Sequence, residues 1–160
     1  MDFNFLSEYF SPEMATFIVS MLPVSELRGS IPLAIGFYNM DPLKAYFISV
    51  IGNIIPVAIV LIVIEPVSKC LMEKSKMFNN FFSWFFARTR RKYNSKFEKW
   101  GALALITFVA IPLPVTGGWT GAIAAFVFGI PIRKALPLIT LGVMIAGVIM
   151  TGLSLGVWRF

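Results

Sequence analysis

The chain has 160 residues, of which 58% are hydrophobic and 14% are charged, and its mean hydropathy is +0.80. Because soluble domains have about 25% charged residues, this composition excludes an ordinary soluble domain and predicts an integral membrane protein. The net charge is +6. At this length, residues 1–160 allow one membrane domain with a few crossings and leave no room for a separate soluble domain.

Several classes of chemistry lack the residues they need. The single cysteine, Cys70, excludes an intrachain disulfide, and without any histidine a zinc site lacks its usual ligands. No Walker sequence is present, so nucleotide hydrolysis is excluded. Glu26 and Asp41 are the only acids in the two apolar parts of the chain, which leaves no nucleophile and base pair. We therefore expect a non-enzymatic protein with no catalytic residue, metal or cofactor.

The first predicted element is a short helix over residues 12–22. Ser11, Pro12 and Glu13 provide a capping side chain, a proline in the first position and an acid in the first turn, which is typical of a helix start. At about 1.5 Å per residue the helix spans roughly 16 Å, about half of the hydrocarbon core. It therefore stops within or beside the membrane.

The next stretch, residues 23–36, reads PVSELRGSIPLAIG and places Glu26 and Arg28 in apolar surroundings. Charges at membrane depth are costly and usually face a protein interior or a water-filled cavity. Two prolines, the second of them Pro32, disrupt a helix, and Gly29 permits the tight backbone that a break requires. We interpret this stretch as a broken, re-entrant segment that carries a polar site.

A helix restarts at Pro42, and residues 45–64 form an uncharged run of 20 residues that ends at Glu65. This run is long enough to span the bilayer. Asn53 lies inside it. Two interpretations stay open: Asn53 marks a kink and a close-packing point of the helix, or its side chain lines a pathway.

Residues 66–99 differ in kind, with nine basic residues against two acids. The positive-inside rule places this connection in the cytoplasm. Its phenylalanines recur at helical spacing, which is typical of an amphipathic helix lying in the membrane surface. Topology explains the cations, so we do not expect nucleic-acid binding. We predict that some of these cations, and one later arginine, either contact anionic lipid headgroups or serve topology alone. They are Arg88, Arg90, Arg91, Lys92 and Arg133.

Residues 100–132 contain no charge over 33 positions, which exceeds one straight crossing, so the chain must fold back. Pro112, Pro114 and the glycines that follow place the break at residues 112–118. A short return helix over residues 122–128 would present free amide hydrogens to anionic groups, with Thr116 and Thr120 supplying hydroxyls. In the alternative interpretation, Gly117 and Gly121 form a small-residue helix contact.

The last predicted element is a second spanning helix over residues 135–158, an uncharged run of 24 residues. Arg133 and Lys134 mark its cytoplasmic border, so both termini are expected outside the cell membrane. Gly152 and Gly156 form a small-xxx-small pair suited to helix packing within or between subunits. Since two full crossings enclose little, we expect a homo-oligomer.

The two halves are weakly similar when the sequence is shifted by 90 residues. The shift aligns Lys44 with Lys134 and Gly52 with Gly142. Residues 1–65 and 100–160 then each contain a short helix, a proline- and glycine-broken re-entrant hairpin and a full transmembrane helix. With the joining segment 66–99 in the cytoplasm, the repeats are inverted. Such an all-α membrane fold is typical of secondary transporters.

The blocks SELRGSIPLAIG at residues 25–36 and PLPVTGGWTGA at residues 112–122 resemble the bacterial and archaeal family of small multidrug export proteins. More distantly, the chain is similar to the DedA/VTT superfamily. That resemblance implies paired re-entrant loops, lipid translocation or proton-coupled transport, and a membrane-embedded acid at Glu26. The superfamily's second-half arginines have no counterpart in residues 100–132, and Arg133 is the nearest candidate.

Three functions remain open. A proton-coupled secondary transporter or small-molecule exporter would use Glu26 as the proton carrier beside Arg28. A lipid translocase would pass an anionic phospholipid or polyprenyl-phosphate headgroup through the two breaks. Alternatively, the two charges form a structural ion pair within a membrane protein. The candidate pathway residues are Glu26, Arg28, Gly29, Pro32, Asn53, Pro112, Pro114, Thr116, Gly117, Gly118 and Thr120. The expected partners are the bilayer with its anionic lipids, a small-molecule or lipid substrate, and further copies of the chain.

Overall fold

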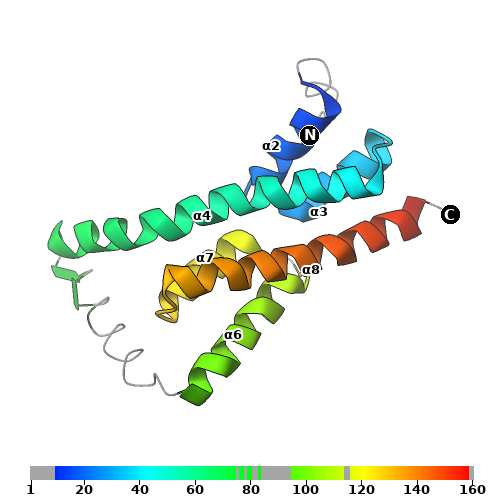
Figure 1. Cartoon of the computed structure of the whole chain (residues 1–160). Helices are drawn as coiled ribbons and strands as arrows, with labels where there is room; N and C mark the ends of the chain where they lie inside the picture. Colours follow the sequence, from blue (N-terminus) through cyan, green and yellow to red (C-terminus); the bar gives the residue numbers. More distant parts are fainter. Residues whose placement is uncertain are drawn as a thin grey trace.

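The computed structural model describes residues 10–74, 95–113 and 116–158, together with residues 76, 77, 79, 80 and 83. Within these residues every regular element is a helix (Figure 1). In chain order the elements are α2 (Pro12–Met21), α3 (Glu26–Pro32), the π-helix η1 (Leu33–Phe37), α4 (Pro42–Lys74), α6 (Ser95–Ala110), α7 (Gly118–Val127) and α8 (Ile132–Trp158). The predicted all-helical class is confirmed.

The two long helices, α4 and α8, organise the molecule. Both are long and apolar enough to cross a membrane. They contact each other, and each also contacts a short helix of the other half: α3 packs against α8, and α7 packs against α4 (Figure 1). The predicted order of short helix, break, short helix and long helix therefore occurs twice, and the two halves interlock. Their inverted orientation in a membrane stays a prediction.

Helix α2 begins as the sequence predicts. The Ser11 hydroxyl accepts a hydrogen bond from the Met14 amide at 3.3 Å, with Pro12 in the first turn. The helix packs along α4, and Lys44 Nζ forms an ion pair with Glu13 Oε1 at 2.6 Å where the two helices start. Its end at Met21 lies one residue before the expected end.

The break in the first half lies before Glu26 and not at Pro32, which corrects the sequence interpretation. Residues 22–25 form the turn, and Pro32 lies inside a continuous helical segment made of α3 and η1. A proline ring clashes with the carbonyl one turn earlier in a regular α-helix. Here the helix widens directly after Pro32, where the Tyr38 amide donates to the Leu33 carbonyl at 3.1 Å. The chain therefore stays helical through Pro32 and continues directly into η1.

Helix α4 continues beyond the expected end at Glu65 and passes through Pro66 to Lys74. An ion pair between Lys69 and Glu65 at 2.8 Å supports this extension at the favourable spacing of four residues. Residues 66–74 of the predicted connection 66–99 therefore belong to α4. The headgroup candidates Arg88, Arg90, Arg91 and Lys92 lie outside the described residues.

Helix α7 starts at Gly118, four residues before the predicted return helix. Gly117 caps it with a φ of 152°, a backbone conformation that side-chain-bearing residues rarely adopt. Its end agrees with the prediction: Gly129 has a φ of 68°, and the Ile130 amide donates to the Ala125 carbonyl at 2.8 Å.

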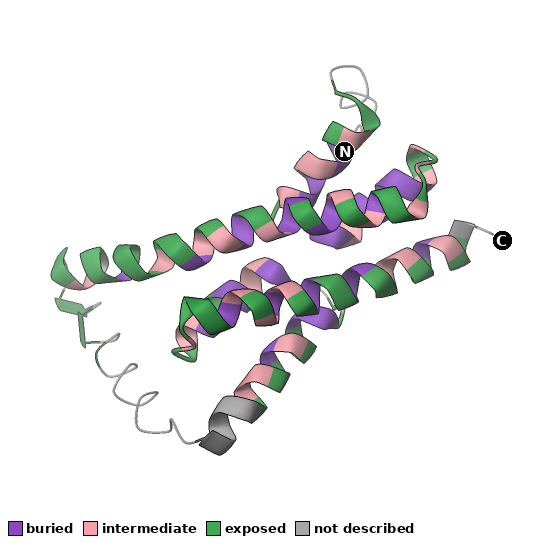
Figure 2. Ribbon diagram, viewed as in Figure 1, coloured by how far each residue is buried: buried purple, intermediate pink, exposed green. Residues whose placement is uncertain are grey.

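The distribution of polarity is that of a membrane protein. Several polar side chains are buried between the helices, namely Thr16, Ser20, Glu26, Ser30, Ser49 and Asn53. In contrast, α4 exposes an apolar stripe made of Leu43, Phe47, Ile51, Ile55, Ile59 and Ile62. Figure 2 shows exposed residues recurring along the outer side of both long helices. A hydrocarbon environment would cover such faces.

Candidate functional site

The two breaks of the chain meet in the structure. Arg28, in α3, reaches the loop before α7, where its Nη2 donates hydrogen bonds to the carbonyl and, at 2.8 Å, to the hydroxyl of Thr116. The same hydroxyl donates to the Ile111 carbonyl at 2.7 Å and accepts from the Leu113 amide at 3.1 Å. Thr116 therefore joins Arg28 to the end of α6, through Ile111 and Leu113.

Glu26 reaches the first turn of α7. The Trp119 amide donates to Glu26 Oε1 at 3.3 Å, and the glutamate is only 6% exposed. The first amides of a helix lack partners in their own helix and form the positive end of its dipole. Because Gly117 supplies no side-chain cap, this carboxylate from the other half of the chain takes that role.

Gly117 and Gly118 allow the close approach. A Cβ atom at Gly117 would overlap the Glu26 carboxylate, and one at Gly118 would lie 2.6 Å from Asn53 Oδ1. The first glycine thus faces α3, and the second faces α4. Gly121 makes a close helix contact as well, as the small-residue interpretation predicts. A Cβ there would lie 2.5 Å from Val109 of α6.

Asn53 is fully buried between α2, α4 and α7. Its Nδ2 donates to the Ser20 carbonyl at 3.2 Å, whereas its Oδ1 has no hydrogen-bond partner. The predicted close-packing role agrees with this position. A role in a pathway stays a prediction.

Glu26 and Arg28 do not form an ion pair with each other. Ion pairs of the described residues include Lys44 with Glu13 and Lys69 with Glu65. Glu26 and Arg28 each contact the second half of the chain instead. These contacts link the two halves, and the two charges also attract each other beyond ion-pair distance. A purely structural role of the two charges stays a prediction.

The backbone of Glu26 is strained. Its φ is 45°, in the left-handed region that residues other than glycine avoid. Such a conformation costs on the order of 1–3 kcal/mol and persists only where the surrounding contacts enforce it. Here the contact with α7 lies at the first residue of α3, directly after the turn.

A cavity of about 10 Å³ lies beside Glu26, which is room for about one water molecule. Arg28, Pro112 and Gly117 line it, together with Val143, Ala146 and Met150 of α8. The carboxylate therefore sits next to a small enclosed space and not in a wide channel.

The remaining sequence candidates lie apart from this contact. Thr120 donates to the Gly117 carbonyl at 3.3 Å, within its own helix. A Cβ at Gly29 would lie 2.7 Å from Ser25, so this glycine serves the local turn. Pro32 adjoins the π-turn described above, and Pro114 lies outside the described residues.

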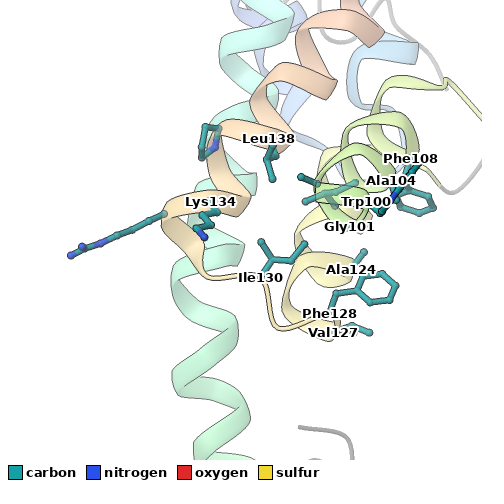
Figure 3. Close-up of a pocket in the computed structure, with 14 residues that line it drawn as sticks. Trp100, Gly101, Ala104, Phe108, Ala124, Val127, Phe128, Ile130, Lys134 and Leu138 are labelled. Atoms are coloured by element: carbon teal, nitrogen blue, oxygen red, sulfur yellow. The ribbon is translucent and has the colours of Figure 1, made fainter. Parts of the chain in front are cut away.

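A larger cavity of about 960 Å³, which we call the α6–α8 groove, was not predicted from the sequence. Its lining is almost entirely apolar and comes from α6, the end of α7 and the start of α8. Figure 3 shows Trp100 and Phe108 on one side and Leu138 and Lys134 on the other. Arg133 lines this groove and not the cavity beside Glu26. The sequence feature that could have indicated this groove is a group of three small lining residues in α6, Gly101, Ala102 and Ala104.

The chain matches a model of a protein family over residues 26–149, which is more than half of its length. No curated protein and no solved structure matches it. The predicted link to the DedA/VTT superfamily is not shown by this match. The matched range begins at Glu26, directly after the first break, and includes the second break and the start of α7. The chain therefore belongs to the family described as "Putative small multi-drug export protein".

Proposed function

We propose that this protein is a secondary transporter in which Glu26 carries a proton and Arg28 orients the loop that faces it. The family description names multidrug export. The observation that carries the proposal is the buried Glu26 carboxylate, held in a strained backbone against α7 of the other half. Because the Glu26 carboxylate itself forms this contact, protonation of Glu26 would change the interaction between the two halves.

The physical logic rests on opposing effects on the carboxylate. Burial disfavours its charged form, while the α7 amides and the neighbouring Arg28 favour it. Protonation would weaken the contact with the positive end of α7. The two halves could then separate at the breaks, which is the motion that alternating access requires.

The membrane arrangement belongs to the same proposal. We place α4 and α8 across the cell membrane, the two breaks inside it as re-entrant hairpins, the basic residues 66–99 on cytoplasmic anionic lipids and both termini outside. The apolar outer faces of α4 and α8 support this placement. We also propose a homo-oligomer, because no described residue lies within 4 Å of a Cβ at Gly152 or Gly156, so this small-xxx-small pair can pack against another copy.

A second candidate function is translocation of an anionic lipid. The α6–α8 groove favours it, because its lining is apolar and Arg133 and Lys134 lie at its edge (Figure 3). An acyl chain fits an apolar lining, and an anionic headgroup is attracted by the cations. In this function Glu26 and Arg28 would act on the headgroup during its passage.

Transport in proteoliposomes tests both functions. The purified protein is reconstituted, and the movement of cationic dyes, organic anions and a fluorescent phospholipid is followed with and without a pH gradient. We expect solute movement that follows the gradient and is lost in Glu26→Gln. Glu13→Gln, which neutralises an acid at the molecular surface, is the matched control and should keep wild-type activity.

The outcomes separate the candidates. Gradient-driven solute transport that survives in a folded Glu26→Gln variant would remove the proton-carrier role. Phospholipid movement that ignores the gradient, without solute movement, would establish the lipid translocase instead.

A further inference from the structure

The α6–α8 groove forms where two helices diverge from a close contact. Near the end of α6, Val109 packs against two glycines: a Cβ at Gly121 of α7 would lie 2.5 Å from it, and one at Gly142 of α8 would lie 2.7 Å from it. Figure 1 shows α6 and α8 diverging from this region toward their starts. The small lining residues of α6 do not fill the space between them, so the groove stays open.

The polar side chains that line the groove are all hydrogen-bond donors. They belong to Trp100, Arg133 and Lys134, and none of the described lining residues has a carboxylate, hydroxyl or amide side chain. An indole, a guanidinium and an ammonium donate hydrogen bonds and accept none. A ligand that pairs with these groups must therefore supply acceptor atoms.

The charges at one end of the groove favour an anion. Arg133 and Lys134 are the second and third residues of α8, and the first turn of this helix has no acidic side chain. The positive end of the helix dipole adds to their charge. Figure 3 shows Lys134 on the side of the groove that the start of α8 forms. The potential at this end is therefore positive, and it attracts anions and repels cations.

The rest of the groove suits a compact apolar molecule. On α6 the lining runs from Trp100 to Phe108, and a rise of about 1.5 Å per residue makes this distance about 12 Å. Half of the hydrocarbon core of a bilayer is about 15 Å thick, so two extended acyl chains would reach beyond the groove. The volume of about 960 Å³ lies in the range of about 300–1,000 Å³ for pockets that enclose one small molecule.

A second cavity links this groove with the contact between the two halves. It has a volume of about 470 Å³, and Trp100, Ala104 and Phe108 line both cavities. The second cavity also reaches Thr116, whose hydroxyl accepts a hydrogen bond from Arg28. The apolar surface of α6 thus leads from the groove to the second break.

We propose that the α6–α8 groove is the site at which the transporter takes up its substrate, and that this substrate is a lipophilic organic anion. Its apolar body lies between α6 and α8, and its carboxylate or sulfonate lies at Arg133 and Lys134. This inference rests on the proposed transport function, and it deepens it by naming the substrate class and its binding site. The second candidate function would place an anionic phospholipid in the same groove.

Photoaffinity labelling of the purified full-length protein in phosphatidylcholine nanodiscs tests the site without requiring transport. The probes are two benzophenones that differ only in their charged group, a sulfonate or a quaternary ammonium. Labelled peptides are identified by mass spectrometry, and probe concentrations are corrected for partitioning into empty nanodiscs of the same lipid. We expect the sulfonate probe to label α6 and the start of α8, at a half-saturating concentration at least about tenfold below that of the ammonium probe, because two cations attract it.

Two pairs of variants make the result specific. Ala104→Trp fills the groove and should remove the labelling, whereas Leu103→Trp adds the same side chain at the neighbouring exposed position, outside the groove lining, and should keep it. The double substitution Arg133→Gln, Lys134→Gln should abolish the preference for the sulfonate probe. Lys74→Gln removes a cation from the end of α4 and should leave this preference unchanged.

Two results with the wild-type protein would overturn the proposal. One is equal labelling of the groove by the two probes, and the other is labelling by the sulfonate probe only outside the groove. Phosphatidylglycerol added to the nanodiscs should leave the corrected labelling unchanged. Displacement of the sulfonate probe by this lipid would assign the groove to a phospholipid and would overturn the small-molecule site.

The proposed function and this inference fail in different ways. Gradient-driven transport of dyes without labelling of the groove by the sulfonate probe would leave a transporter and remove this site. Labelling of the groove by the sulfonate probe without transport of any solute would keep the anion site and remove the transporter.

Discussion

At the scale of single residues, Glu26 and Arg28 join the two halves of the chain. Their partners, Trp119 and Thr116, lie 93 and 88 positions away in the sequence. Each side chain satisfies backbone groups that a broken helix leaves without partners. The two charged side chains therefore provide hydrogen-bond partners for backbone groups at the second break. These hydrogen bonds offset part of the cost of burying an acid and a base in an apolar protein.

Substitution of Gly117 tests the fit between Glu26 and α7. We expect Gly117→Ala to lower the free energy of unfolding by about 1–3 kcal/mol and to reduce transport, because the methyl group overlaps the Glu26 carboxylate in a crowded site. The φ of 152° at this position adds strain for any side chain. Thermal unfolding of the purified protein in one detergent measures the effect.

Gly101→Ala is the control for this substitution. Among the described residues nothing lies within 4 Å of a Cβ at Gly101 in α6, so its replacement should leave stability unchanged or raise it slightly through helix propensity. Equal stability of the two variants would contradict the close contact between Gly117 and Glu26.

The sequence identified the important residues of the site but not their contacts. Two charges in an apolar segment singled out Glu26 and Arg28, and the proline- and glycine-rich break singled out Thr116 and Gly117. The contacts of Glu26 and Arg28 with the second break could not be predicted, because a sequence motif does not indicate which distant segment it meets in the fold. The alternative that the two charges form an ion pair followed from their closeness in sequence, whereas in the structure each side chain donates to or accepts from a backbone group of the second half.

At the scale of elements, helix starts were more predictable than breaks. Ser11 and Pro12 locate the start of α2, since capping depends on neighbouring residues only. Pro32 was misleading, because the chain stays helical through it and continues into η1, which the proline itself does not reveal. The early start of α7 has the same origin: its first turn is capped from α3 and not by its own sequence.

The contact between the starts of α2 and α4 predicts a dependence on pH. The Lys44 ammonium donates a hydrogen bond to Glu13 and lowers the pKa of this carboxyl below its ordinary value of 4.5. A lowered pKa in the folded state contributes stability above the unfolded pKa, and this contribution is lost as the pH falls through the folded pKa. The gain from Lys44 should therefore be present at pH 7 and shrink toward pH 3.

Thermal unfolding of wild type and Lys44→Gln at both pH values measures this gain. Because the pair is exposed, the difference in midpoint at pH 7 should be small, and salt should reduce it. Lys74→Gln removes a cation outside the described ion pairs and serves as the control. A difference between wild type and Lys44→Gln that is unchanged at pH 3 would mean that Lys44 acts through packing and not through Glu13.

At the scale of the whole molecule, polarity is distributed in the opposite way from a soluble protein. Buried polar side chains gather where α2, α3 and α4 meet, and the long helices expose apolar side chains (Figure 2). Composition alone indicated a membrane protein, because a lipid environment favours apolar side chains over much of the protein surface. The α6–α8 groove was not predictable in the same way, since a cavity depends on the angle between helices.

The natural cysteine reports the orientation of the molecule in the membrane. Cys70 is exposed in the last part of α4, in the segment that the basic residues place in the cytoplasm. A membrane-impermeant maleimide should therefore label Cys70 in permeabilised cells and leave it unlabelled in intact cells. A Cys70→Ser, Phe10→Cys variant moves the thiol to the exposed start of the first half and should be labelled in intact cells. Labelling of Cys70 from outside would invert the topology, and the positive-inside argument for residues 66–99 would then be wrong for this chain.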